Sequence, residues 1–118
     1  MVCKDDWRCA ILTAMPTPDL ALVRELKRRA EQALPGRIVR VMLYGSRARG
    51  DARDDSDWDV AVFLKGEPTP KDRRVLSDID FDLMMETGQH VQAIAIDHEQ
   101  SAEQSYFVTN VLKDGLVA

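Results

Sequence analysis

The sequence predicts an α+β domain built on a short mixed sheet of about three strands, flanked by helices. Segments with apolar residues at helical spacing alternate with runs of β-branched residues. Glycine and proline mark the boundaries between these segments. Hydrophobic residues make up 45% of the 118 residues, which is enough to form one core.

The first predicted helix begins at Thr17-Pro18-Asp19, which offers an N-cap hydroxyl and a proline at the first helical position. Its apolar stripe runs up to Pro35-Gly36, which ends the helix. Residues 38–44 and 58–64 are rich in β-branched residues and are predicted strands. The polar, glycine-bearing stretch 45–56 between them is expected to form a turn or a short helical piece.

The second half of the chain predicts two more helices and one more strand. A long helix is expected to start at Thr69-Pro70 and to end at Gly88, followed by a strand over residues 91–96. Ser101 and Gln104 form a capping box that opens a last helix. We expect the apolar stripes of these helices to pack in the core.

Residues 1–16 lack periodicity and are expected to form a flexible leader, which leaves residues 17–118 as a single domain. Met15 is an alternative start that the sequence does not decide. Cys3 and Cys9 match no common zinc spacing and form no disulfide framework. We therefore expect reduced thiols and a cytoplasmic protein.

The overall charge limits the classes of partner. The net charge of −4 and the pI near 5.1 give no general positive field, so direct binding of nucleic acid is not expected. No apolar run approaches the roughly 18 residues that a membrane span requires, so no membrane association is expected.

The chemically informative stretch begins where the first predicted strand ends. Gly45 and Ser46 follow Tyr44 in a tight turn, and a glycine lets the backbone approach a ligand closely because it has no Cβ. Backbone N–H groups and the Ser46 hydroxyl can donate to phosphate oxygens. Arg47 adds a planar cation suited to phosphate. This half of the stretch therefore predicts a phosphate-binding turn.

Two carboxylates stand at the entry to the next predicted strand. Asp57 and Asp59 are two residues apart, so both are expected on one face of the sheet, with Trp58 on the other. Adjacent carboxylates repel each other unless a proton, an arginine or a metal ion compensates. Mg²⁺ binds through a few carboxylate oxygens together with water and substrate phosphate.

The turn and the carboxylate pair together form the pattern G-S-x10-D-x-D. An aspartate pair at this spacing is common and often only solvated, and a Gly-Ser pair alone indicates nothing. A phosphate-binding turn beside a metal-binding pair, with an apolar strand on each side, is what nucleotidyl transfer requires.

The run Gly45 to Gly50, G-S-R-A-R-G, with S-D-W-D from Ser56 to Asp59, resembles the minimal nucleotidyltransferase family of the DNA polymerase β superfamily. The resemblance extends over residues 17–118 and implies a palm-like nucleotidyltransferase fold. Many members are antitoxins paired with a HEPN-type toxin, and the implied activity is transfer of AMP from ATP to a tyrosine of that toxin.

The resemblance also implies roles for individual residues. Gly45 and Ser46 would hold the triphosphate of ATP, with support from Arg47 and Arg49. Asp57 and Asp59 would bind Mg²⁺ and form the catalytic pair.

One position departs from the superfamily pattern. A third acid often lies on the strand that follows, and the equivalent position here is Gln92, or else His90; neither is an acid. Asp97 lies at the far end of that strand and has the wrong parity for the same face, unless a bulge shifts it.

Three functions therefore stay open. The first is an ATP- and Mg²⁺-dependent nucleotidyltransferase that modifies a partner protein. The second is a catalytically weak or inactive nucleotide-binding module that neutralises its partner by complex formation, which Gln92 keeps open. The third is modification of small molecules, as by aminoglycoside nucleotidyltransferases, although a chain of this size leaves little room for an acceptor pocket. A HEPN-type toxin is the expected partner, and a homodimer is possible.

Overall fold

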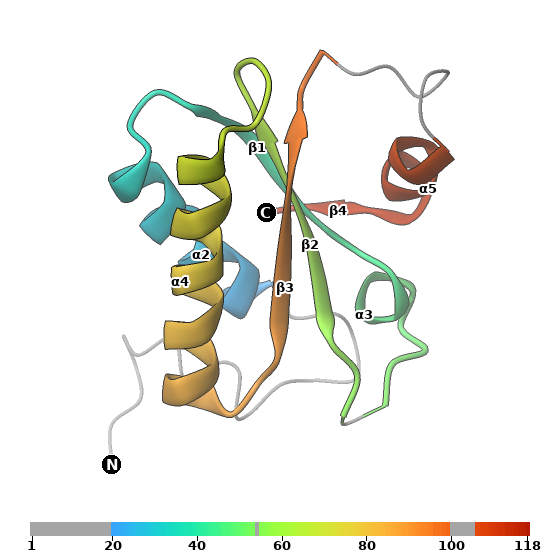
Figure 1. Ribbon diagram of the computed structural model, residues 1–118. Coiled ribbons are helices and arrows are strands. Elements are labelled where there is room, and N and C mark those ends of the chain that lie inside the picture. The colour runs from blue at the N-terminus through green and yellow to red at the C-terminus, as the bar shows by residue number, and fades with distance from the viewer. Residues whose placement is uncertain (1–19, 54, 100–105) are drawn as a thin grey trace.

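The computed structural model describes residues 20–53, 55–99 and 106–118, which form a mixed sheet with helices on both faces (Figure 1). The predicted leader, the helix start at Thr17-Pro18-Asp19, the two cysteines and the Ser101–Gln104 capping box lie outside the described residues. In chain order the elements are α2 (Ala21–Ala33), β1 (Ile38–Tyr44), α3 (Ser46–Arg49), β2 (Trp58–Leu64), α4 (Pro70–Thr87), β3 (Val91–Asp97), α5 (Tyr106–Asp114) and β4 (Leu116–Val117).

The strand order in the sheet is β3-β2-β1-β4. Strand β1 pairs antiparallel with both β2 and β4, whereas β2 and β3 run parallel because α4 connects them as a crossover. The expected α+β class is confirmed. The fourth strand, β4, was not predicted, because two residues are too few to show an alternating pattern.

Helices α2 and α4 cover one face of the sheet, and their apolar stripes form the larger core (Figure 1). The fully buried members of this core include one alternate set of side chains from β1 and β2. They are Leu22, Val23, Leu26, Ala30, Val41, Leu43, Val60, Val62, Leu64, Leu76 and Leu83.

Helix α5 packs against the opposite face, where Val108 and Val111 contact a smaller cluster around Phe63 and Ala61. These two residues belong to the alternate set of β2 side chains, which points away from α2 and α4. Asp59 has the same parity as Ala61, so the α5 face is the face that carries the candidate site.

The ends of α4 match the prediction. The Thr69 hydroxyl accepts a hydrogen bond from the backbone N–H of Asp72, and the Asp72 carboxylate accepts one from the N–H of Thr69. This capping box precedes Pro70, and Gly88 ends the helix with a φ of 74°. Helix α2, by contrast, begins at Ala21, later than the sequence predicted.

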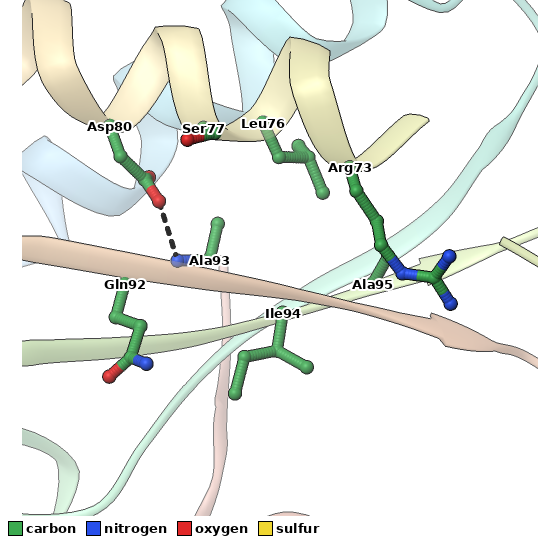
Figure 2. Close-up of a pocket in the computed structure, with 8 residues that line it drawn as sticks. All are labelled: Arg73, Leu76, Ser77, Asp80, Gln92, Ala93, Ile94 and Ala95. Atoms are coloured by element: carbon green, nitrogen blue, oxygen red, sulfur yellow. Dashed lines mark hydrogen bonds between the residues drawn. The ribbon is translucent and has the colours of Figure 1, made fainter. Parts of the chain in front are cut away.

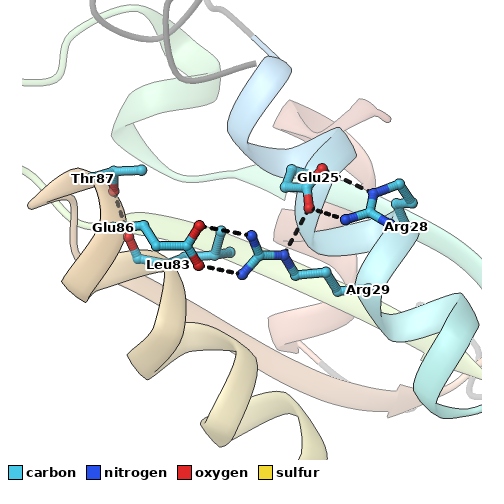
Figure 3. Close-up of polar contacts among 6 residues, drawn as sticks. All are labelled: Glu25, Arg28, Arg29, Leu83, Glu86 and Thr87. Atoms are coloured by element: carbon cyan, nitrogen blue, oxygen red, sulfur yellow. Dashed lines mark hydrogen bonds and ion pairs between the residues drawn. The ribbon is translucent and has the colours of Figure 1, made fainter. Parts of the chain in front are cut away.

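A buried carboxylate ties α2 to α4 (Figure 3). Glu25 is 7% exposed and accepts hydrogen bonds from Arg28 and Arg29, at 3.0 Å and 2.7 Å. Arg29 also donates to both carboxylate oxygens of Glu86 on α4, at 2.7 Å and 3.0 Å. Within the described ranges, none of the helices has the length and apolar character that a membrane span requires.

Candidate active site

The turn after β1 has the sharp geometry that the sequence predicts. Gly45 has φ 76° and ψ −157°, a region of backbone conformation that is essentially restricted to glycine. Its carbonyl accepts hydrogen bonds from the N–H groups of Ala48 and Arg49, which start the short helix α3. The stretch expected to be a turn or short helical piece therefore contains a four-residue helix, Ser46–Arg49.

The sheet register places Asp59 at the centre of a row of three side chains. Asp59 is the Cα partner of Tyr44 on β1 and of Gln92 on β3, so these three residues lie side by side on one face. Asp57 precedes β2 and is exposed. Burial, and secondly the nearby Asp57 carboxylate, raise the pKa of Asp59, while Arg49 opposes that rise.

The glycine turn and the carboxylate pair converge. A Cβ built on Gly45 would lie 2.6 Å from Oδ2 of Asp59, closer than two such atoms can approach. Gly45 thus packs directly against this carboxylate, and Ser46 is the next residue. The contact brings together the two halves of the G-S-x10-D-x-D pattern.

The two arginines of α3 occupy different surroundings. The Arg47 guanidinium lies over the ring of Trp58, at 4.6 Å from the ring centroid, and donates to the carbonyl of Ser56. Arg49 is half exposed and lies 3.3 Å from the carboxylate of Asp51. Because Arg49 also lowers the pKa of Asp59, its charge acts on the carboxylate pair.

Gln92 occupies the position beside Asp59 where the superfamily pattern expects a third acid. Its side chain is neutral and adds no charge beside Asp59, whose pKa is raised by burial and by the Asp57 carboxylate. Asp97 lies at the other end of β3, as the Cα partner of Leu64. No bulge interrupts the parallel register, so Asp97 does not take the place of the third acid.

Tyr44 is a site neighbour that the sequence reasoning missed. Burial, and secondly the charge of Asp59, raise the pKa of Tyr44 to about 12. Its ring meets the ring of Phe107 edge to face, with centroids 5.3 Å apart. The sequence feature that could have indicated Tyr44 as a site neighbour is its place as the last residue of a predicted strand, directly before Gly45.

The carboxylate pair fits a hard divalent cation. In residues 20–53, 55–99 and 106–118, no group of three or more His, Cys, Asp or Glu side chains is arranged to hold a metal. Asp57 and Asp59 alone would supply the protein oxygens, and Mg²⁺ is commonly bound by one or two carboxylates plus substrate phosphate. The repulsion between these two acids and the close backbone approach at Gly45 both suit a bound cation and phosphate.

A hollow with a volume of about 360 Å³ lies between α4 and the β3 edge, and Gln92, the neighbour of Asp59, is one of the residues that line it (Figure 2). Asp80 reaches from α4 and accepts a hydrogen bond from the N–H of Ala93 at 2.9 Å. Burial raises the pKa of Asp80 to about 6, although the bond from Ala93 opposes the rise. Its other carboxylate oxygen is buried without a partner.

A family model described as "Polymerase beta, Nucleotidyltransferase" matches residues 25–117. The chain belongs to this nucleotidyltransferase family. The match spans most of the domain, including the turn, both aspartates and Gln92. It confirms the family that the motif predicted.

One curated relative of this nucleotidyltransferase is MJ0141 of Methanocaldococcus jannaschii, named as a candidate protein adenylyltransferase. It is 35% identical over 60 residues, which are 51% of this chain and 61% of the relative. The chain thus matches less than two thirds of that relative's length.

Solved structures share the nucleotidyltransferase fold. A candidate nucleotidyltransferase from Sulfolobus solfataricus is 28% identical with a TM-score of 0.57, and the match covers 83% of this chain and 77% of that one. A toxin–antitoxin with AMP-PNP has a TM-score of 0.60 at 19% identity, covering 81% and 68% of the two chains. A double aspartate-to-glutamate variant of the toxin–antitoxin MntA-HpeT also reaches 0.60, at 15% identity, covering 80% and 69%.

Proposed function

We propose that this protein is a Mg²⁺-dependent nucleotidyltransferase that transfers AMP from ATP to a hydroxyl of a partner protein. We further propose that it acts in the cytoplasm as the antitoxin of a HEPN-type toxin–antitoxin pair. The observation that supports this most directly is the contact between Gly45 and the Asp59 carboxylate, because it joins a phosphate-binding turn to a metal-binding pair.

Different residues of the site would bind the triphosphate and the metal ion. Gly45 and Ser46 would offer backbone N–H groups and a hydroxyl to the triphosphate, and Arg49 would add a positive charge beside it. Asp57 and Asp59 would hold Mg²⁺, which when bound neutralises the triphosphate and polarises the α-phosphate. The sequence also predicts Arg47 as a phosphate ligand, although its guanidinium is engaged by Ser56 and Trp58.

The reaction itself is a displacement at phosphorus. The acceptor oxygen forms a bond to the α-phosphorus, the bond to the bridging oxygen breaks, and pyrophosphate leaves. Because Gln92 is neutral, the row across the sheet offers no further carboxylate beside Asp59 to take the hydroxyl proton. We propose that the proton passes to water or to a group on the partner.

Two kinds of relative support a protein acceptor. MJ0141 is named as a candidate protein adenylyltransferase, and two solved structures with the same fold are toxin–antitoxin proteins. The exposed position of Asp57 is consistent with an acceptor that approaches from another molecule.

The proposal is tested by incubating the protein with Mg²⁺, ATP labelled at the α-phosphate, and the toxin encoded beside its gene. Label should appear on the toxin and should be lost with Asp57→Asn and with Asp59→Asn. ATP labelled at the γ-phosphate should leave no label. Transfer that survives both substitutions would contradict the proposal.

Gln92 favours a second candidate function, a nucleotide-binding module that neutralises its toxin by complex formation alone. In that case a tight complex would form without label on the toxin. Asp59→Asn would leave the complex intact, whereas an enzyme would lose its neutralising effect with the same substitution.

A further inference from the structure

Arg47 contacts the chain on both sides of Asp57. Its Nη2 donates to the carbonyl oxygen of Ser56 at 2.9 Å, and its Nε lies 3.3 Å from the same oxygen. The guanidinium carbon lies 4.6 Å from the centroid of the Trp58 ring. Ser56 and Trp58 are the immediate neighbours of Asp57, so one side chain of α3 holds the segment that carries this carboxylate.

Trp58 is a firm support for that contact. Its side chain is 5% exposed and packs in the core between the sheet and the α2–α4 layer. The indole Nε1 donates to Oε1 of Gln89 at 3.0 Å, and the backbone N–H donates to the carbonyl of His90 at 2.8 Å. The Arg47 guanidinium therefore lies over a ring that is itself held by burial and by a side-chain hydrogen bond.

The fold holds the two aspartates in different ways. Asp59 lies inside β2, paired in register with Tyr44 and Gln92 on the neighbouring strands. Asp57 lies before β2 begins and is exposed. The sheet thus fixes Asp59 directly, whereas Asp57 lies just outside it, between Trp58, the first residue of β2, and Ser56 in the preceding loop.

We infer that Arg47 is a positioning residue, which couples the phosphate-binding turn to Asp57. It does so by donating to the backbone carbonyl of Ser56, before Asp57, and by stacking on the ring of Trp58, after Asp57. A guanidinium suits this task, because its planar face stacks on an aromatic ring while its edge donates to a carbonyl. The inference deepens the proposed function, since it concerns the pair to which Mg²⁺ is assigned.

Amide exchange measured by NMR tests this without ligand. In Arg47→Met, the amides of Ser56 and Trp58, which donate to the carbonyls of Arg53 and His90, should exchange at least about tenfold faster, because the segment between them loses its side-chain support. Arg47→Lys keeps the charge without the planar fork and should also exchange faster, which gives a second variant should Arg47→Met fold poorly. Unchanged rates in a folded variant would overturn the inference.

Arg49→Met is the matched control, because Arg49 lies on the same short helix and its carboxylate contacts are to Asp51 and Asp114. It should leave the exchange of the Ser56 and Trp58 amides at the wild-type rate. Equal acceleration in Arg49→Met would show a general loosening of α3 and would contradict a specific role of Arg47.

Binding of Mn²⁺ alone, followed by electron paramagnetic resonance, separates positioning from phosphate binding. Because loss of the Arg47 contacts should let Asp57 move, Arg47→Met should bind Mn²⁺ about tenfold more weakly in the absence of nucleotide. Loss of a residue that supports a metal ligand typically has an effect of this size. Wild-type Mn²⁺ affinity in Arg47→Met would overturn the inference. If the wild-type protein binds no Mn²⁺, the metal part of the proposed function fails, and the exchange rates still decide the role of Arg47.

Discussion

Gly45 packs directly against the Asp59 carboxylate, so closely that a single methyl group on Gly45 would lie 2.6 Å from Oδ2. The two residues are fourteen positions apart in sequence, and the antiparallel pairing of β1 with β2 brings their strand ends together. This contact places the turn that would bind phosphate beside the carboxylate that would bind metal.

Gly45→Ala should disrupt the site more than it disrupts the fold. The backbone conformation of Gly45 strains any other residue, which costs on the order of 1–3 kcal/mol of unfolding free energy. The new methyl group must also push the Asp59 carboxylate aside. We expect binding of ATP with Mg²⁺ to weaken at least about tenfold by isothermal titration calorimetry.

Gly88→Ala is the control for backbone strain. Gly88 also has a positive φ, 74°, but a Cβ there meets nothing within 4 Å. It should lower the unfolding free energy by about 1–2 kcal/mol and leave ATP binding unchanged. Equal loss of ATP binding in both variants would show that general destabilisation, not the contact with Asp59, is responsible.

Asp59→Asn should abolish nucleotidyl transfer without lowering the free energy of unfolding. Burial and the neighbouring Asp57 raise the pKa of Asp59, so the folded state disfavours its charged form. Stability is therefore lost as pH rises from the unfolded pKa of this group through its folded pKa, and the neutral amide avoids that loss. Urea unfolding at pH 7 should show Asp59→Asn at least as stable as the wild type, while nucleotidyl transfer is lost. A clearly less stable variant would contradict this electrostatic account.

Much of this fold could be predicted because local signals agreed with the tertiary structure. The α4 ends show it best: Thr69, Pro70 and Gly88 each occupy the capping position that the sequence indicated. Helix α2 is the counterexample, since it begins at Ala21 with Leu20 as an N-cap that makes no side-chain hydrogen bond. Strand β4 exists only through its pairing with β1, which no local pattern reveals.

The positions of the candidate site residues in the fold were predictable from the sequence, but only part of the geometry between them. Spacing alone placed Asp59 on the face opposite Trp58, and the register confirms Gln92 as its neighbour on β3. The stacking of Arg47 on Trp58 could not be foreseen, because it depends on how α3 packs after the turn. The position of Tyr44 beside Asp59 likewise depends on strand register.

Glu25→Gln should test the link between α2 and α4 (Figure 3). Hydrogen bonds from Arg28, and secondly from Arg29, outweigh burial and lower the pKa of Glu25 below its ordinary value of 4.5. The stabilisation is therefore present above that pH and is lost as pH falls through the folded pKa. Urea unfolding at pH 7 should show a loss of roughly 1.5–3 kcal/mol, typical of hydrogen bonds to a charged group.

The same comparison at pH 3 should show a smaller difference between Glu25→Gln and the wild type. Arg24→Gln is a suitable control, because Arg24 is an exposed arginine on the same helix. Its effect on the unfolding free energy should stay within about 0.5 kcal/mol. A loss for Glu25→Gln that is as large at pH 3 as at pH 7 would show that packing, not charge, is responsible.

Asp80→Asn should reveal a destabilising buried charge in the hollow between α4 and β3 (Figure 2). Burial raises the pKa of Asp80 from 3.8 to about 6, so the folded state holds its proton more tightly than the unfolded state. Stability that depends on this group falls as pH rises between these two values. Asparagine keeps an acceptor for the N–H of Ala93 and does not titrate.

Urea unfolding at pH 4 and pH 7 measures this effect. The unfolding free energy of Asp80→Asn relative to the wild type should rise from the lower pH to the higher. Asp82→Asn, an exposed position on the same helix, should show little change at either pH. A flat difference for Asp80→Asn across this range would contradict the raised pKa.

The most direct test of the central claim is the affinity of the protein for ATP with Mg²⁺ and with EDTA, measured by isothermal titration calorimetry on the wild type and on Asp59→Asn. If the turn and the aspartates form one metal–triphosphate site, the wild type should bind ATP at least about tenfold more tightly with Mg²⁺, and Asp59→Asn should lose that gain. Equal affinity with Mg²⁺ and with EDTA, or an undiminished gain in Asp59→Asn, would contradict the claim.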